Sequence, residues 1–203
     1  MTIIVAVKTD EKIIIGADKR VTEGNTIVSE NESKILLKEL TIAGYQHINY
    51  EKFLIAFSGA YSLFELLKTF NTPTKDEKDS FLEYLYKTYI PKLNTHLRKY
   101  NFIQDYNGQD GVDWELLIAY KNQLFLVEFN LGIIEINTPY YAIGAPRDIA
   151  LGSLYTSNIK KHPVEIFMVK NAIKACAAHS ISCNNNIELY SVSENEIKKI
   201  KIN

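Results

Sequence analysis

The sequence predicts an α+β fold, a four-layer αββα sandwich in which two antiparallel sheets are packed between two layers of helices. Short apolar runs rich in β-branched residues are separated by polar turn residues, which is typical of antiparallel strands. The order along the chain is strands, two helices, strands, two helices and strands. Stacked layers let each of these elements bury its apolar face.

The first group of strands begins at the N-terminus. Two apolar runs at residues 3–7 and 13–17 flank a polar turn at 9–12 and predict a β-hairpin. A polar loop over 21–31 follows, and residues 33–37 predict a short third strand. We expect 38–52 to be irregular and 53–57 to be a buried strand.

Two helices should follow the first strands. Residues Ser58 and Gly59 end the strand, and the next segment has the composition of a helix. A long helix over 79–101 has an apolar stripe at helical spacing. Pro91 lies inside this helix and should kink or interrupt it, because proline lacks the N–H group and clashes with the preceding turn.

The second half repeats this order. Three extended runs predict an antiparallel meander, a further strand is expected at 141–144, and two helices and a closing hairpin follow. The expected ranges are 114–120, 124–130 and 133–137 for the meander, 145–157 and 163–180 for the helices, and 187–192 and 196–202 for the hairpin.

Composition limits the classes of function. A chain of 203 residues without an internal linker is expected to form a single domain over 1–203. The formal net charge of −1 gives no general attraction to nucleic acid or to an anionic membrane. No apolar run approaches the roughly 20 residues that span a membrane, and the start lacks the layout of a signal peptide. Two cysteines make no disulfide framework, so we expect a cytoplasmic protein.

Three residues near the N-terminus suggest one chemistry. The predicted hairpin places Thr2 beside Asp18, and the third strand would bring Lys34 to the same edge. Removal of Met1 would give Thr2 a free α-amine, whose ordinary pKa of about 7.7–8.0 suits a base near neutral pH. A hydroxyl needs such a base to act as a nucleophile. Lys34 would lower the pKa of that hydroxyl, and Asp18 would hold Lys34 charged and oriented.

The same segment resembles a known family. The stretches TIIVAV, GADKRVT and GNTIV and the lysine of ESKI are similar to the N-termini of proteasome β-subunits and the bacterial peptidase HslV, which are N-terminal-nucleophile hydrolases. The GNT stretch is more similar to HslV. Later segments, including AIGA, continue the likeness over nearly the whole chain. The resemblance implies the same αββα sandwich.

It also implies a function. The expected reaction is peptide-bond hydrolysis by Thr2, with no metal or organic cofactor, and with an oxyanion site formed by the backbone at Ser58 and Gly59. Residues in the positions of the first specificity pocket are Val21, Glu32, Ala56 and Ala60. Small walls with one acid suggest a large or basic substrate side chain. Stacked rings of six or seven copies, protein substrates and an ATP-dependent unfoldase are the implied assembly and partners.

The sequence also departs from the family. Ala145 follows the AIG motif where active members often have serine, and Ser180 and Cys183 occupy places where proteasome subunits have an aspartate and a serine. Two alternatives therefore stay open, a weak or inactive ring or scaffold subunit and an amidase that acts on a small amide. His179 lies four residues before Cys183, but we expect these two side chains to serve packing rather than catalysis.

Overall fold

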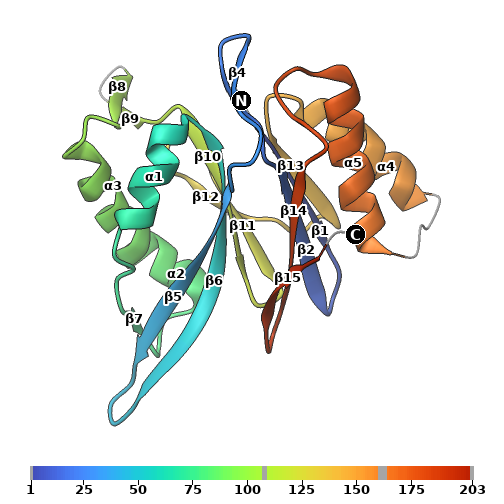
Figure 1. Cartoon of the computed structure of the whole chain (residues 1–203). Coiled ribbons are helices and arrows are strands. Elements are labelled where there is room, and N and C mark those ends of the chain that lie inside the picture. Colours follow the sequence, from blue (N-terminus) through green and yellow to red (C-terminus); the bar gives the residue numbers. More distant parts are fainter. Residues whose placement is uncertain (1, 107–108, 160–163, 202–203) are drawn as a thin grey trace.

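The computed structural model describes residues 2–106, 109–159 and 164–201. Two sheets face each other at the centre of the molecule (Figure 1). Helices α1 to α3 cover one outer face, and α4 and α5 cover the opposite face. The expected four-layer αββα sandwich is therefore confirmed.

The first sheet contains both ends of the described chain. Its strand order is β13-β1-β2-β14-β15, and every neighbouring pair is antiparallel. The predicted N-terminal and closing hairpins both form, and the strand expected at 141–144 pairs with the first strand. The bounds are β1 Ile3–Lys8, β2 Lys12–Asp18, β13 Tyr140–Gly144, β14 Ile187–Ser193 and β15 Ile197–Ile200.

The second sheet has the order β12-β11-β10-β6-β5-β7, with a parallel pair only between β5 and β7 among the described strands. It contains the predicted meander. Its bounds are β5 Ile35–Ala43, β6 Ile48–Gly59, β7 Lys75–Asp76, β10 Trp114–Tyr120, β11 Gln123–Val127 and β12 Ile133–Glu135. Two small hairpins lie outside both sheets, β3 Val21–Glu23 with β4 Thr26–Ser29 and β8 Gln104–Tyr106 with β9 Gln109–Gly111.

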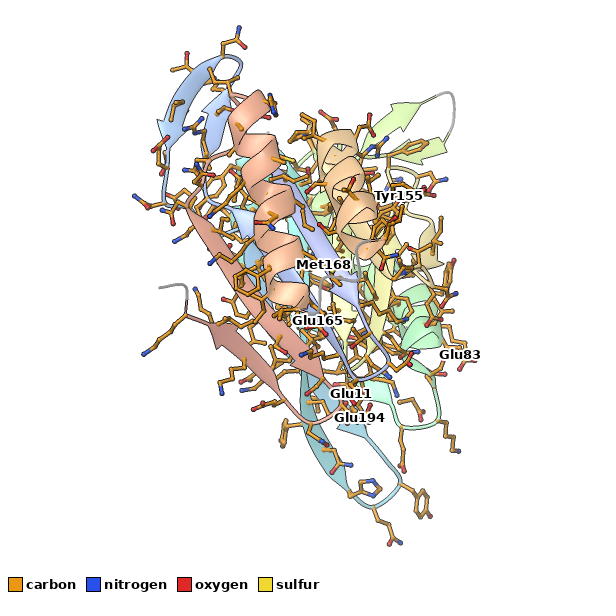
Figure 2. The ribbon with its side chains drawn as sticks, turned by 90° about the vertical axis from the view of Figure 1, so that its right-hand side faces the viewer. Glu11, Glu83, Tyr155, Glu165, Met168 and Glu194 are labelled. Atoms are coloured by element: carbon orange, nitrogen blue, oxygen red, sulfur yellow. The ribbon has the colours of Figure 1, made fainter. Side chains whose placement is uncertain are left out.

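The helices form the two outer layers. The first layer contains α1 Tyr61–Thr69, α2 Phe81–Tyr84, the π-helical turn η1 Leu85–Tyr89 and α3 Ile90–Arg98. The second contains α4 Arg147–Ile159 and α5 Glu165–His179. Figure 2 looks onto this second layer, with Tyr155 on α4 and Met168 on α5. Pro163, where the last helix was expected to begin, and Ile202, the expected end of the closing hairpin, lie outside the described residues.

Three clusters of buried side chains correspond to the three interfaces of the four layers. In β1, Val5 packs toward α4 and α5, whereas Ile4 packs toward the second sheet. In β6, Phe57 packs toward the helices of its own side, whereas Ala56 faces the first sheet. Strands with both faces buried require apolar side chains at consecutive positions. This explains the unbroken apolar runs at 3–7 and 53–57.

The expectation that residues 38–52 are irregular is wrong. Strands β5 and β6 form one long antiparallel hairpin that pairs as far as Ala43 with Ile48. Its far end projects beyond the helices (Figure 1), and Tyr45 at the turn is 97% exposed. Leu40 and Ile42 are buried in the core, but the residues nearer the turn are exposed, so the alternating pattern that marks a strand covers only part of this hairpin.

The segment around Pro91 is continuous but not uniformly α-helical. A π-helical turn over Leu85–Tyr89 directly precedes α3, and Pro91 lies in the first turn of α3. In a continuous helix, proline lacks the N–H group that would bond to the preceding turn, and its ring clashes with that turn. The wider turn thus lets the helical path continue past a residue that would break a regular α-helix.

Candidate active site

Thr2, Asp18 and Lys34 lie together at one edge of the two sheets. Thr2 immediately precedes β1, Asp18 is the last residue of β2, and Lys34 immediately precedes β5. The pairing of Ile4 with Ala17 places the end of β2 beside the start of β1. The side chain of Lys34 crosses from the second sheet to the first, where its Nζ atom lies 2.7 Å from Asp18 Oδ1.

Asp18 has further backbone partners. Its Oδ1 atom also accepts a hydrogen bond of 3.0 Å from the backbone N–H of Ile3, and its Oδ2 atom accepts one of 2.9 Å from the N–H of Arg20. The carboxylate thereby holds the peptide unit that joins Thr2 to Ile3 as well as Lys34. The position of Thr2 is fixed by the same group that binds the lysine.

The lysine and the aspartate form a buried ion pair. The side chain of Asp18 is 0% exposed and that of Lys34 is 2% exposed. Burial lowers the pKa of Lys34, because removal from water disfavours the charged amine, and the nearby Asp18 carboxylate opposes this effect. The ion pair therefore limits the fall in the pKa of Lys34 that burial causes.

Thr2 and Lys34 open onto a cavity of about 610 Å³ between the two sheets. Gly144 forms part of its wall and lies against Thr2. A Cβ atom on Gly144 would be 2.0 Å from the Thr2 carbonyl oxygen, and the backbone of Gly144 has a φ of +109°, which side-chain-bearing residues rarely adopt. Glycine at this position lets β13 approach the nucleophile candidate closely.

Ser58 and Gly59, the predicted oxyanion residues, both line the cavity. The backbone N–H of Phe57 donates to the Lys34 carbonyl oxygen at 3.0 Å, and N–H groups alternate between the two edges of an antiparallel strand. Ser58, which pairs with Glu115 of β10, consequently points its N–H group toward β10. Gly59 follows the direction of Phe57, so its N–H group faces the β5 side of β6, away from β10.

Two of the four predicted pocket residues line the cavity and two do not. Val21 and Ala60 line the cavity. Glu32 lies behind the wall, where it accepts a hydrogen bond of 2.8 Å from the hydroxyl of Tyr61, a lining residue. The Tyr61 and Ser29 hydroxyls lower the pKa of Glu32. Ala56 is fully buried in the core between the sheets and is not among the lining residues.

Several wall residues were not predicted. Tyr61, Trp114 and Phe129 add aromatic surface to the cavity. Tyr61 begins α1 directly after the predicted pocket residue Ala60, so its position in the sequence could have indicated that it lines the cavity. Trp114 begins β10 and is paired with Gly59 across the sheet, a contact that the sequence alone did not reveal.

The positions at which the sequence departs from the family lie close to the site. Ala145 lines the cavity. Ser180 and Cys183 follow α5, and the Cys183 thiol faces the Ser180 carbonyl oxygen at 4.0 Å. Burial raises the pKa of Cys183 to about 12, so the thiol is neutral near pH 7. His179 is exposed at the end of α5, and no hydrogen bond joins it to Cys183 among the described residues.

The described residues contain no cluster of three or more histidine, cysteine, aspartate or glutamate side chains that could hold a metal ion. Within the same part of the chain, no helix is both long enough and apolar enough to cross a membrane. Met1, which must be removed to free the Thr2 amine, is outside the described residues.

Comparisons with known proteins identify the fold. No model of a known protein family matches the chain. A search of curated proteins likewise gives no match. Among solved structures, BPH of Thiobacillus denitrificans in complex with epoxomicin is similar with a TM-score of 0.71 and 17% identity, over 96% of this chain and 100% of that one.

Two further structures agree. BPH of Thiobacillus denitrificans has a TM-score of 0.73 at 17% identity, over 95% of this chain and 98% of that one. HslV from Trypanosoma brucei has a TM-score of 0.62 at 13% identity, over 94% and 99% of the two chains. Together with the layer order and the placement of Thr2, Asp18 and Lys34, these likenesses show that the chain has the HslV-like fold of the N-terminal-nucleophile hydrolases.

Proposed function

We propose that the protein is a threonine-type N-terminal-nucleophile peptidase formed by a single domain over residues 1–203. The observation that supports this most directly is the buried ion pair between Lys34 Nζ and Asp18 Oδ1, at 2.7 Å, beside a Thr2 that lines a cavity. A buried lysine that is held charged next to a hydroxyl favours ionisation of that hydroxyl.

The proposed reaction starts after removal of Met1. The Thr2 hydroxyl attacks the carbonyl carbon of a peptide bond, and its proton passes to the Thr2 amine directly or through a water molecule. The backbone N–H of Gly59 stabilises the oxyanion, with Ser58 fixing the strand end beside it. A positioned backbone donor of this kind contributes about 10²–10³ in rate. The amine then protonates the leaving group, and water hydrolyses the acyl-ester.

The experiment is an intact-mass measurement before and after incubation with epoxomicin, the compound bound to BPH in one similar structure. A peptide epoxyketone closes its ring with both a hydroxyl and a free terminal amine. We expect a mass that lacks Met1 and gains one adduct per chain, and no adduct in Thr2→Ala. Retained Met1 with no adduct would refute the proposal for this form of the protein.

The substrate preference is proposed from the cavity wall. Val21 and Ala60 leave space for a large side chain, and the Tyr61 hydroxyl connects this wall to the carboxylate of Glu32. Because Glu32 stays ionised near neutral pH, it favours a basic group. Fluorogenic peptides with lysine or arginine before the cleaved bond should react faster than those with aspartate or glutamate, and Glu32→Gln should reduce the difference. Equal rates would exclude this preference.

One alternative has specific support. Ala145 in the cavity wall, with Ser180 and Cys183 after α5, gives the site fewer hydroxyl and carboxylate groups than the family pattern. Missing support around reacting groups lowers activity even where those groups are present. A scaffold subunit would show no adduct and no change on Thr2→Ala. An amidase of the same fold would cleave small amides but not peptides.

A further inference from the structure

Glu188 is a buried carboxylate that the proposed mechanism does not use. It lies on β14 and its side chain is 2% exposed. The register of β14 pairs Glu188 with Ala17 and the preceding Ile187 with Asp18. Glu188 on β14 is therefore displaced by one residue from the position directly opposite Asp18 on β2.

The carboxylate of Glu188 holds the start of β5. Its Oε1 atom accepts a hydrogen bond of 2.6 Å from the backbone N–H of Lys34. The hydroxyl of Ser33 lies 2.8 Å from Oε2 and 3.0 Å from Oε1. The exposed Lys199 of β15 places its Nζ atom 3.8 Å from Oε2. Hydrogen bonds from several donors to one buried carboxylate fix the positions of the groups that donate to it.

These contacts fix the backbone of Lys34 on both sides. Its N–H group donates to Glu188 of the first sheet, and its carbonyl oxygen accepts the Phe57 N–H group of the second sheet. Lys34 is thus anchored where the chain passes from one sheet to the other. Because the backbone of Lys34 is anchored, less conformational entropy is lost when its long side chain is ordered against Asp18.

We propose that Glu188 is a positioning residue for Lys34, which fixes the backbone of the lysine through its N–H group and adds a second negative charge near this buried residue. The consequence for reaction rate rests on the proposed peptidase function, whereas the effect on Lys34 itself does not. The sequence motifs did not indicate this role, because Glu188 is a single acidic residue in the strand IELYSVS and belongs to none of the motifs.

Three titratable groups from different parts of the chain influence the pKa of Lys34. Asp18 of β2, Cys183 after α5 and Glu188 of β14 all raise the pKa of Lys34 against the larger effect of burial. Cys183 is a neutral thiol near pH 7, since its pKa is about 12. Asp18 and Glu188 remain as the anionic groups, and the free Thr2 amine would be the neighbouring cation. Removal of the Glu188 charge should consequently lower the pKa of Lys34.

The test is a titration of the Lys34 amine by NMR in protein with isotope-labelled lysine, with Lys34→Arg used to assign the signal. Glu188→Gln should titrate at lower pH than the parent protein. Glu196→Gln is the matched control, because Glu196 is exposed at the β14–β15 turn and the same charge is removed far from Lys34. An unchanged Lys34 titration in a folded Glu188→Gln would overturn the proposal.

A second variant separates charge from geometry. Ser33→Ala removes one donor to Glu188 and leaves the carboxylate and the Lys34 N–H group in place. We expect its Lys34 titration to match the parent, while the rate of epoxomicin adduct formation falls on the order of tenfold or more through misplacement of the lysine. An unchanged rate would refute the anchoring part. If Glu188→Gln does not fold, Glu188→Asp keeps the negative charge but shortens the side chain, so it tests the anchoring of Lys34 by the same rate of adduct formation.

The two proposals fail in different ways. The Lys34 titration is measured in a Thr2→Ala background, which cannot form the adduct. If the parent protein does not react with epoxomicin but Glu188→Gln still shifts the titration, the peptidase proposal fails and the role of Glu188 stands. If the parent reacts and the titration does not shift, the role of Glu188 fails alone.

Discussion

At the scale of single residues, Asp18 connects the structure to the chemistry. One carboxylate oxygen binds both the Lys34 ammonium group and the Ile3 N–H group, and the other oxygen binds the Arg20 N–H group. Asp18 therefore binds both the backbone that follows Thr2 and the side chain of Lys34. Loss of its charge should affect both the folding stability and the reactivity.

The first prediction concerns this pair. Asp18→Asn should lower the free energy of unfolding by about 3–5 kcal/mol, because a buried lysine loses its counter-charge. Lys34→Met removes the charge but leaves the two backbone donors of Asp18, and the double variant should recover part of the loss. Urea denaturation at pH 7 measures all three. A midpoint for Asp18→Asn equal to that of the parent would contradict the buried ion pair.

The second prediction concerns the substitution of Gly144 by alanine. Gly144→Ala should cost about 1–3 kcal/mol, because alanine must adopt an unfavourable backbone conformation. Its Cβ atom would lie 2.0 Å from the Thr2 carbonyl oxygen, so Thr2 must move and epoxomicin labelling should slow. Gly152→Ala is the control: a Cβ atom there meets nothing within 4 Å, and alanine in a helix should stabilise the protein by about 0.5–1 kcal/mol. Parent-like labelling by Gly144→Ala would contradict this reading.

At the scale of elements, the start of α2 shows how a short helix is held. Ser80 and Glu83 form a reciprocal capping box, in which each side chain binds the backbone N–H group of the other residue. A capping side chain replaces a hydrogen bond that the first helical turn lacks. The cap fixes where the long helical path to Pro91 begins, which the apolar stripe did not determine.

The cap gives a pH prediction. The Ser80 backbone N–H group, followed by the Lys87 side chain, lowers the pKa of Glu83 to about 2 from an ordinary value of 4.5. Because the folded-state pKa is depressed, the stabilisation is complete above about pH 4.5 and is lost as the pH falls toward 2. Glu83→Gln should therefore be less stable than the parent at pH 7, with a smaller difference near pH 2.

Urea midpoints at the two pH values provide the measurement. Glu11→Gln is the control, because Glu11 is exposed at the β1–β2 turn and has no hydrogen bond or ion pair among the described residues (Figure 2). Its difference from the parent should be small at both pH values. A Glu83→Gln difference that is equally large at pH 7 and pH 2 would contradict the ionised cap.

At the scale of the whole molecule, the layered fold leaves apolar side chains on the surface of the second helical layer. Tyr155 and Ile159 of α4 and Phe167 of α5 are each more than half exposed, and Figure 2 shows this layer face on. Exposed apolar side chains on a monomer are consistent with contacts between copies. This agrees with the homo-oligomeric ring that the sequence resemblance implies.

Light scattering tests the assembly. The stacked rings that the sequence resemblance implies predict a solution mass many times the 23.2 kDa of one chain. Charged substitutions at Ile159 and Phe167 should reduce this mass if α4 and α5 form a contact between copies, whereas a charge at the exposed Tyr45 on the opposite hairpin serves as a comparison position. A monomer or dimer in the parent protein would refute the ring and favour the amidase alternative.

The local pattern of apolar and polar residues was sufficient to predict the four layers of the fold. Apolar runs at 3–7, 13–17 and 114–120 predicted strands because consecutive buried positions demand apolar side chains on both faces. The hairpin over 3–17 predicted that Thr2 and Asp18 lie at one edge, because a hairpin brings its two ends together. The expectation for Lys34 rested on a third strand returning to that edge and on the family resemblance, whereas the structure brings Lys34 there from the second sheet.

Tertiary structure decided what depends on contacts between distant segments. The β5–β6 hairpin is a strand pair without a strong local signal, and the direction of the Gly59 N–H group follows from the bond between Phe57 and Lys34. Glu188 holds Lys34 from 154 residues away along the chain. No local pattern encodes such a partner, because the free energy of a buried carboxylate is set by the donors that the fold brings to it.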